Sequence, residues 1–432
     1  MKKLSGIIIT FCILTTLPVC KKKDIVEDYT PTLTSSDISN AKFLLSGKRL
    51  SYTINLTKIS SEGIETPIIL LDEDNEPVEW KYVDYVDFLF TSDKYVGMVI
   101  KWRINASIYQ SEDYKQRIFY LINKNDSKIV FTYNFSELTS LDYASYFSMD
   151  QNDIIYYLSD LSLSGNSLYR FKWNESNTSD SKPELIEKDI QKYYLAPNGD
   201  LACLKKTYSS PGVVNYYYTI KFSDRSQLEV PSWGNNSYNP QEGYGIYTLG
   251  INKSGGFCAS YKNPNSTFEM KILQTINNKT DFWYCNSVTE TINKFYIVRG
   301  QFWGIHNTDN TYSDFINLSN CGSYSIFSAY LPIKYLNYDV DRICTSQNYF
   351  YYHNTDKNEV YRFYPEDGAT IVWKTFPSEM DIYGSEYEFS IDDFAIFTLY
   401  AHNNIWLLVL LDNNGNMLAQ KEVRLISSAI VL

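Results

Sequence analysis

Short runs of alternating hydrophobic and polar residues, separated by polar turns, fill most of this chain. The clearest example runs from Phe389 to Ile426 and contains three hydrophobic runs, a polar turn at 402–404 and an Asn-Gly turn at 412–416. Alternation with a period of two is typical of strands with one buried face, and short turns of this composition join antiparallel neighbours. The pattern predicts an antiparallel meander.

The segment that leads into this meander recurs upstream. Its last copy reads Phe389-Ser390-Ile391-Asp392, so that an aromatic residue, a serine and an acid precede a hydrophobic run. Further copies stand at Phe90–Asp93, Phe147–Asp150, Leu195–Asp200, Leu249–Asn252, Val298–Gly300 and Cys344–Gln347. These seven lead-ins lie about 50 residues apart, a spacing typical of propeller blades with about four short strands each. We therefore predict an all-β fold, a β-propeller with about seven four-stranded blades; six or eight blades also fit.

Hydrophobic runs at Tyr52–Leu56 and Pro67–Leu71 come before the first full lead-in. A ring of sheets avoids exposed edges when strands from the two ends of the chain pair with each other. We expect these N-terminal strands to pair near the C-terminal meander and to close the last blade.

The lead-ins, above all Ala196-Pro197-Asn198-Gly199-Asp200, resemble the serine-proline-aspartate-glycine blade motif of bacterial periplasmic propellers such as that of the Tol system. Most copies in this chain lack the proline and the glycine. The resemblance implies a propeller, and it implies a role as a protein-binding scaffold, as in many such proteins. It carries no catalytic residue to this chain, because propellers include both enzymes and passive binders.

The N-terminus has the pattern of an export signal. Lys2 and Lys3 precede an apolar run at 7–17 that is too short to span a bilayer. The next residues, Leu17-Pro18-Val19-Cys20, resemble the lipobox of bacterial lipoproteins, whose cysteine carries the lipid, although Val19 departs from the usual small residue. The lysines that follow Cys20 favour an outer-membrane destination. The alternative is a plain secretory signal in which Cys20 has no role.

This pattern predicts three segments. Residues 1–19 form a lipoprotein signal peptide, residues 20–41 form the lipidated Cys20 with a flexible polar tether, and residues 42–432 form a single β-propeller domain. With 44% hydrophobic and 16% aromatic residues, the chain has enough apolar surface for one large core. We expect a monomer.

The formal net charge of −11 restricts the partners. A nucleic-acid-binding surface must be basic to replace condensed counterions, so nucleic acid is excluded as an expected partner. An acidic surface is also weakly repelled by anionic lipid, and we therefore expect membrane attachment through the lipid anchor alone. The expected partner is a protein or a polysaccharide of the cell envelope.

The chemistry-bearing residues do not form a catalytic motif. The three histidines, His306, His353 and His402, lie far apart, and the last two are expected in hairpin turns. The sequence contains no nucleophile elbow, phosphate loop or dinucleotide fingerprint, and no cofactor or metal site is predicted. The acidic runs 72–76 and 412–416 suit calcium, but hairpin turns have the same composition and are the favoured interpretation.

Five cysteines follow Cys20, and their spacing matches neither a zinc motif nor a complete set of disulfides. We favour buried free thiols over a disulfide between neighbouring blades. The five are Cys203, Cys258, Cys285, Cys321 and Cys344.

Carboxylates offer the one enzymatic alternative, because glycoside cleavage needs only two suitably separated acids. Candidates from the lead-ins are Asp93, Asp150, Asp200 and Asp392. A short acid in such a position more often accepts backbone N–H groups of its own turn, and we favour that role. The alternative function is a glycoside hydrolase or lyase with paired carboxylates in the central channel.

Aromatic residues in a loop provide the remaining functional candidates. Trp233 and Tyr238 lie among Asn, Ser, Gly and Pro between residues 231 and 240, and such a loop suits sugar stacking or a protein contact. Trp283 and Trp303 are expected in the core. We therefore predict a lipid-anchored envelope propeller that binds a partner without catalysis, with Trp233 and Tyr238 as ligand contacts.

Overall fold

The chain divides into two units, Met1–Ser35 and Ser36–Leu432, and only the second contains described residues. The computed structural model describes residues 37–48, 54–72, 74–78, 83–102, 116–135, 144–159, 166–171, 182–196, 199–210, 213–221, 227–231, 245–251, 257–262, 271–276, 279–284, 294–307, 313–317, 334–336, 343–354, 356–365, 368–390, 392–401 and 404–432. Within these residues the regular elements are β-strands and one 3-10 turn, η3 (Val423–Leu425), so the predicted all-β class is confirmed.

Antiparallel four-stranded sheets recur along the described part of the chain. The first has the strand order β3-β2-β1-β31, and four others follow the chain order β4 to β7, β19 to β22, β23 to β26 and β27 to β30. The strands are β1 (Phe43–Lys48), β2 (Ile54–Ile59), β3 (Glu65–Ile68), β31 (Ile426–Val431); β4 (Val83–Thr91), β5 (Tyr95–Trp102), β6 (Gln116–Asn123), β7 (Ile129–Asn134); β19 (Lys294–Val298), β20 (Gln301–Asn307), β21 (Ser313–Asn317), β22 (Lys334–Leu336); β23 (Ile343–Thr345), β24 (Phe350–Asn354), β25 (Glu359–Phe363), β26 (Thr370–Thr375); and β27 (Met380–Phe389), β28 (Ala395–Ala401), β29 (Ile405–Leu411), β30 (Met417–Glu422).

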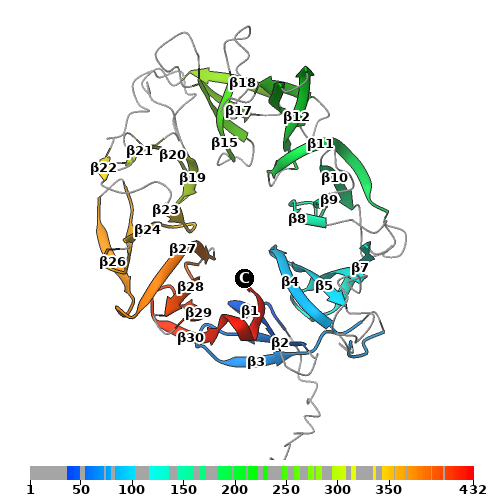
Figure 1. Ribbon diagram of the computed structural model, residues 1–432, viewed down its shortest axis with the longest axis vertical. Helices are drawn as coiled ribbons and strands as arrows, with labels where there is room; N and C mark the ends of the chain where they lie inside the picture. The colour runs from blue at the N-terminus through cyan, green and yellow to red at the C-terminus, as the bar shows by residue number, and fades with distance from the viewer. Residues whose placement is uncertain are drawn as a thin grey trace, which may run out of the picture. The chain divides into compact units, whose positions relative to one another are not determined.

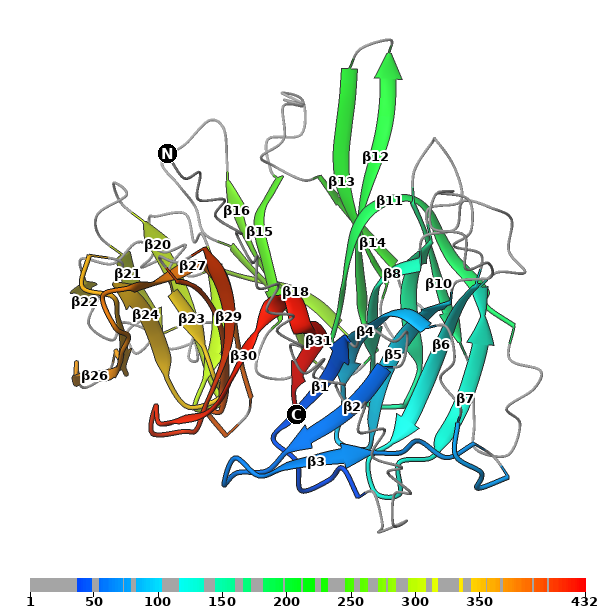
Figure 2. The same ribbon diagram turned by 60° about the horizontal axis from the view of Figure 1, so that its bottom comes forward.

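The middle of the chain forms one seven-stranded sheet and two strand pairs. The sheet runs in chain order from β8 to β14, and the pairs are β15-β16 and β17-β18. The strands are β8 (Ala144–Met149), β9 (Ile155–Ser159), β10 (Asn166–Phe171), β11 (Glu184–Leu195), β12 (Leu201–Ser210), β13 (Val213–Lys221), β14 (Gln227–Pro231), β15 (Gly245–Ile251), β16 (Phe257–Lys262), β17 (Lys271–Ile276) and β18 (Lys279–Tyr284). Figure 2 shows β12 and β13 extending beyond the other strands of their sheet.

Within Ser36–Leu432, the sheets follow one another around a centre. The strands β4, β8, β19, β23 and β27 each form one edge of their sheet and lie nearest the centre of Figure 1, where the C-terminus also lies. Successive inner strands approach each other, as β27 does with β31, β31 with β4, and β4 with β8. The outer strands lie at the opposite edge of each sheet.

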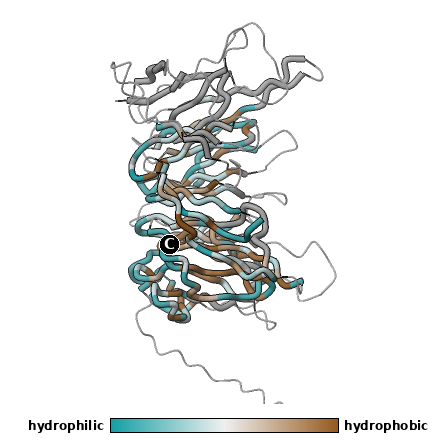
Figure 3. The backbone as a smooth tube through the Cα atoms, turned by 90° about the vertical axis from the view of Figure 1, so that its left-hand side faces the viewer, coloured by the Kyte–Doolittle hydropathy of each residue, from teal (hydrophilic) through white to brown (hydrophobic). Residues whose placement is uncertain are grey.

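The hydrophobic core lies between neighbouring sheets. Strand β5 is buried on both faces: Val96 and Met98 contact a cluster that includes residues of the first sheet, whereas Tyr95 and Val99 contact aromatic residues of the next sheet. In the second of these clusters, the rings of Phe119 and Phe147 stack with their centroids 5.3 Å apart. This contact contributes about 1 kcal/mol beyond the burial of the two rings. Figure 3 shows hydrophobic segments along the strands and hydrophilic segments at the turns.

The two ends of the described part of the chain meet in one sheet. Phe43 of β1 pairs with Val431 of β31, and Leu44 pairs with Ile430. The C-terminal meander of β27 to β30 already forms a complete sheet of four strands, so the N-terminal strands pair with the strand that follows it. Ser46 reinforces the joint, because its hydroxyl accepts the N–H of Ser428 at 2.9 Å.

Candidate functional site

Three of the lead-ins, Phe147–Asp150, Leu195–Asp200 and Phe389–Asp392, continue into five-residue turns whose hydrogen-bond pattern also occurs in three other turns. In the turn 150–154, the N–H of Asp150 donates to Ile154 O at 3.0 Å, and the N–H of Asp153 donates to Asp150 O at 3.1 Å. The turns at 60–64, 72–76, 196–200, 390–394 and 412–416 contain the same two bonds. The fourth residue of each turn has a positive φ, which glycine, asparagine and aspartate adopt at low cost. These residues are Gly63, Asn75, Asp153, Gly199, Asp393 and Gly415.

This turn geometry shows that the candidate acids of the lead-ins are not equivalent. Asp150 is the first residue of its turn, Asp392 is the third and Asp200 is the fifth. The turn at Asp93 is shorter, and there the hydroxyl of Ser92 accepts the N–H of Tyr95 at 3.1 Å. Acids that correspond to each other in the sequence repeat therefore occupy different positions in their turns, and they have different hydrogen-bond partners.

Asp150 has the structural role favoured for it. Its side chain is buried, and Oδ1 accepts the N–H groups of Asn152 at 2.8 Å and Ile154 at 3.0 Å. Burial raises the pKa of the Asp150 carboxyl, and these hydrogen bonds oppose the rise. In the turn 390–394, Ser390 is the first residue, as Asp150 is in its turn, and its hydroxyl accepts the N–H of Phe394 at 3.1 Å. The side chain at this position therefore caps the turn.

The two acidic runs weighed as calcium sites are also capped turns. Asp412 Oδ1 accepts the N–H groups of Asn414 at 2.9 Å and Asn416 at 2.7 Å. Asp72 Oδ1 accepts the N–H of Glu76 at 2.8 Å in the same manner. The hairpin-turn interpretation of both runs is confirmed.

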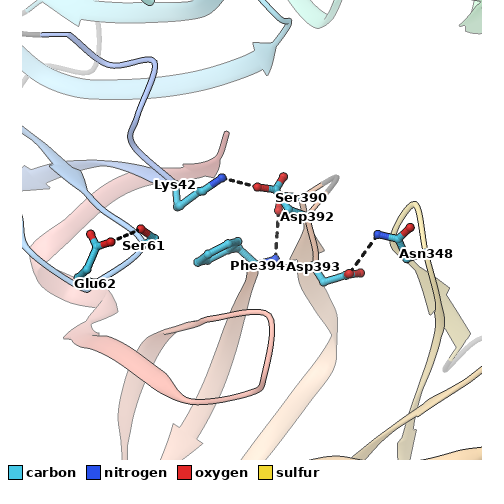
Figure 4. A network of polar contacts seen from close by, with 8 residues as sticks. All are labelled: Lys42, Ser61, Glu62, Asn348, Ser390, Asp392, Asp393 and Phe394. Carbon is cyan, nitrogen blue, oxygen red and sulfur yellow. Dashed lines mark hydrogen bonds and ion pairs between the residues drawn. The ribbon is translucent and has the colours of Figure 1, made fainter.

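Side chains of these turns join neighbouring sheets. Figure 4 shows the turn 390–394 approached from two sides: Lys42 of the first sheet pairs with Asp392, and Asn348 donates to Asp393 Oδ2 at 3.2 Å. At another pair of sheets, Lys94 Nζ lies 3.2 Å from Asp153 Oδ2. A Cβ on Gly199 would lie 3.2 Å from the carboxylate of Asp150, so these two turns are also in close contact. Asp153, Asp392 and Asp393 of these turns thus contribute to contacts between sheets.

Tyr146 on the inner strand β8 has an unusual conformation. Its φ is +51° and its side chain is 71% exposed, although it lies in a strand. The register with β9 breaks between Ser145 and Ser148, which marks a bulge, and Phe147 beside it is buried in the aromatic core. Bulges re-aim side chains, and positive φ in a bulky residue costs about 1–3 kcal/mol that surrounding contacts must offset.

Tyr193 of β11 supplies such contacts. Its hydroxyl donates to Tyr146 O and lies 2.6 Å from Ser148 Oγ. Burial raises the pKa of Tyr193, so the phenol stays protonated and keeps its donor. On the same strand, Lys192 Nζ lies 4.7 Å from the ring centroid of Tyr194. An exposed aromatic ring and a lysine–tyrosine pair therefore occur on β8 and β11, two strands of one sheet that the hydroxyl of Tyr193 connects.

A carboxylate with a strongly perturbed pKa lies outside the lead-ins, on the inner strand β27. The side chain of Glu388 is exposed, yet desolvation by the surrounding protein raises its pKa to about 7, an effect opposed by the N–H of Val431. On the other side of β31, Asp87 of β4 accepts the hydroxyl of Ser428 at 3.3 Å. The sequence contained no signal for either acid, because neither belongs to a turn motif.

The structure tests only part of the predicted residue roles. Cys20, Trp233 and Tyr238 lie outside the described residues. Trp303 is 2% exposed and packs in the core as predicted. His353 was expected in a hairpin turn and lies buried in β24, because the turn begins only after Asn354.

Two cysteines lie in the part of the chain whose side chains are described. Cys203 is a buried free thiol, as favoured from the sequence, whereas Cys344 is only partly buried. Burial raises the pKa of Cys203 to about 12. No group of three or more metal-ligating side chains occurs among the described residues.

Successive antiparallel sheets around a centre, with inner and outer edge strands, define a β-propeller. No protein-family model and no curated protein matches this chain. No helix within the described ranges has the length and apolarity to cross a membrane.

Among solved structures, an acylaminoacyl peptidase of Pyrococcus horikoshii is similar at 12% identity and a TM-score of 0.43, over 78% of this chain and 52% of the peptidase. The β-propeller domain of the Trilobed protease of Pyrococcus furiosus is similar at 10% identity and a TM-score of 0.43, over 79% of this chain and 97% of that domain. A prolyl endopeptidase is similar at 11% identity and a TM-score of 0.44, over 81% of this chain and 48% of the endopeptidase. This chain thus spans about half the length of the acylaminoacyl peptidase and of the prolyl endopeptidase.

Proposed function

We propose that this protein is a lipid-anchored β-propeller of the cell envelope that binds a protein or glycan partner without catalysis. Cys20 is the proposed lipid attachment site, in the outer membrane, and residues 20–41 are the proposed tether. The exposed, strained Tyr146 is the observation that carries the binding role.

We infer eight blades closed into a ring. Strand β11 pairs with β10 through Glu184–Ile190 and with β12 through Ile190–Leu195, which supports two blades in the seven-stranded sheet. Strands β16 and β17 are neighbours, which supports one blade from the two strand pairs. These three blades and the five four-stranded sheets together give eight blades. The pairing of β1 with β31 supports closure, and it accounts for the eighth blade, which has no lead-in of its own.

Tyr146 supports partner binding through the cost of its position. A strained backbone persists only where the surroundings impose it, and such residues cluster at ligand contacts. The hydroxyl of Tyr193 holds the bulge while the ring of Tyr146 stays exposed, and Lys192 and Tyr194 flank Tyr193 on β11. Tyrosine and lysine suit a partner that offers a flat apolar face and negative charge. An acidic glycan or an acidic protein segment meets both requirements.

The test compares capture by the purified protein on a glycan array and in a pull-down from solubilised envelope. Tyr146→Ala should abolish capture, and Trp233→Ala tests the loop predicted from the sequence. Ile371→Ala is the matched control, because Ile371 is 49% exposed on the outer strand β26. Capture that survives Tyr146→Ala would refute the role of this residue, and the absence of any specific capture would refute the binding function.

A second candidate function is glycoside cleavage, favoured by Glu388 alone. A carboxyl with a pKa of about 7 suits a general acid at neutral pH. Such an enzyme needs a second carboxylate on an inner strand, and Asp87 is the candidate. Release of reducing ends from an envelope glycan, lost in Glu388→Gln and in Asp87→Asn, would establish the enzyme over the binder.

The anchor is tested separately. Cys20→Ala should release the protein from the membrane fraction, and a lipid label should be incorporated only in the wild type. Unchanged membrane attachment of the variant would leave the plain secretory alternative.

A further inference from the structure

Two arginines and two tyrosines alternate across two neighbouring sheets, the one of β19 to β22 and the one of β23 to β26. The guanidinium carbon of Arg299 lies 4.2 Å from the ring centroid of Tyr364 and 5.0 Å from that of Tyr349. The guanidinium carbon of Arg362 lies 4.5 Å from the centroid of Tyr349. We call these four residues the arginine–tyrosine ladder. Both positive charges therefore contact one ring and lie within about 10 Å of each other, the screening length in 0.1 M salt.

The ladder is held in place from several directions. Arg299 has a φ of +52°, its N–H donates to Gln347 O at 2.6 Å, and its Nε donates to Asn348 O at 3.1 Å. The hydroxyl of Tyr364 donates to Gln301 Oε1 at 2.6 Å.

Arg362 is fixed in a comparable way from the next sheet. Its Nη1 donates to Asn413 O at 3.1 Å. Because the side chains of both arginines are already positioned, a ligand would find them with little further loss of conformational entropy.

Among the described residues, no carboxylate lies within ion-pair distance of Arg299 or Arg362, in a chain whose net charge is −11. Asp393 accepts the hydroxyl of Tyr351 at 3.2 Å. Burial raises the pKa of Tyr351 and Arg362 opposes this rise, so Arg362 and Tyr351 interact. Asp393 also accepts a hydrogen bond from the side-chain amide of Asn348, so this one buried carboxylate has two donors.

We propose that the arginine–tyrosine ladder binds a phosphate group. Guanidinium groups present planar pairs of N–H donors that match phosphate oxygens, and they retain this capacity while stacked on aromatic rings. Two guanidiniums supply two positive charges, which a phosphate monoester with about −1.5 to −2 charges at pH 7 neutralises better than a single carboxylate. The phosphate is either a free soluble ion or the headgroup of a phospholipid. This inference does not depend on the proposed partner of Tyr146.

The test measures binding of inorganic phosphate to the purified full-length protein by calorimetry at pH 7 and low ionic strength. We expect saturable binding that weakens at least tenfold in Arg299→Gln and in Arg362→Gln, with weaker binding of acetate. Arg424→Gln is the matched control, because Arg424 is exposed and pairs with Glu422 in another sheet. Arg299→Lys keeps the charge and loses the planar donor pair, so it should bind phosphate with intermediate affinity and fold as the wild type does.

A vesicle experiment distinguishes a phospholipid headgroup from a free soluble phosphate as the ligand. Cosedimentation with phosphatidic acid vesicles, compared with phosphatidylcholine vesicles, should be lost in both glutamine variants if the ligand is a lipid headgroup. Phosphate binding without vesicle binding assigns a soluble ligand. Absence of saturable phosphate binding by the wild type, or wild-type affinity in Arg299→Gln and Arg299→Lys, would overturn the proposal and leave the ladder as a contact between sheets.

Discussion

Carboxylates in two regions of this molecule differ in what the fold does with them. In the five-residue turns, Asp150 and Asp393 are buried and accept hydrogen bonds from their own turn or from the next sheet. On the inner strand β27, Glu388 is exposed, and its pKa is raised to about 7. Asp150 and Asp393 therefore have structural roles, whereas the carboxyl whose pKa is raised to about 7 lies outside the lead-ins.

The same contrast separates the aromatic residues. Phe147 belongs to a lead-in and is buried in the aromatic core, whereas its neighbour Tyr146 is exposed through a bulge. Repetition in a propeller sequence reports what every blade needs in order to pack. Residues that depart from the repeat are the better candidates for function. If this comparison holds, substitutions in the turns should reduce stability most, and substitutions on the inner strands should change titration or binding.

The largest effect is expected in a turn, at Gly415. Its φ is +81°, and an added Cβ would lie 2.3 Å from Trp373 O. Gly415→Ala should lower the free energy of unfolding by about 3 kcal/mol, from backbone strain and the clash together. Gly300→Ala is the control, because its φ is +68° and nothing lies within 4 Å, so strain alone should cost about 1 kcal/mol. Equal losses in denaturant unfolding would show that the turn is not tightly packed.

Asp150 should matter more than Asp392 in the same kind of turn. Asp150→Ala removes a buried carboxylate that accepts two partly buried N–H groups, and it should cost about 2 kcal/mol. Asp392→Ala removes an ion pair with Lys42 in which the Asp392 side chain is 50% exposed, and it should cost less than about 1 kcal/mol. Unfolding in urea measures both. The reverse order would contradict the structural role of the buried acid.

Tyr193→Phe tests the support of the Tyr146 bulge. The variant removes the hydroxyl that bonds Tyr146 O and Ser148, and it should cost about 1 kcal/mol of stability. It should also weaken partner capture, because Tyr146 loses its fixed position. Tyr400→Phe removes a hydroxyl that bonds Asn404 at an exposed position in another sheet, and it serves as the control. A variant with unchanged stability and capture would show that the bulge does not depend on Tyr193.

The effect of Glu388 should be visible only as a pH dependence of the stability. Its folded-state pKa of about 7 lies above the ordinary value of 4.5, so the folded protein holds this proton more tightly than the unfolded chain. The resulting stabilisation is fully present below pH 4.5 and is lost as the pH rises to about 7. Glu388→Gln should therefore gain stability relative to the wild type between these values. A constant difference between the two proteins across this range would contradict the raised pKa.

The sequence by itself determined the all-β class, because alternation and turn composition are local properties of the chain. It also determined the capping role of Asp150 and Asp412, since a short side chain bonds N–H groups two and four residues away. These interactions need no other part of the molecule.

The tertiary structure alone decided the rest. The pairing of Phe43 with Val431 joins opposite ends of the chain, and no local pattern specifies such a partner. The exposure of Tyr146 and the pKa of Glu388 depend on neighbouring strands that lie far away in the sequence. The two arginines of the ladder come together only because a turn and a strand of adjacent sheets place them against one tyrosine ring. Exposure, desolvation and charge proximity are set by distances in space, which the order of residues does not contain.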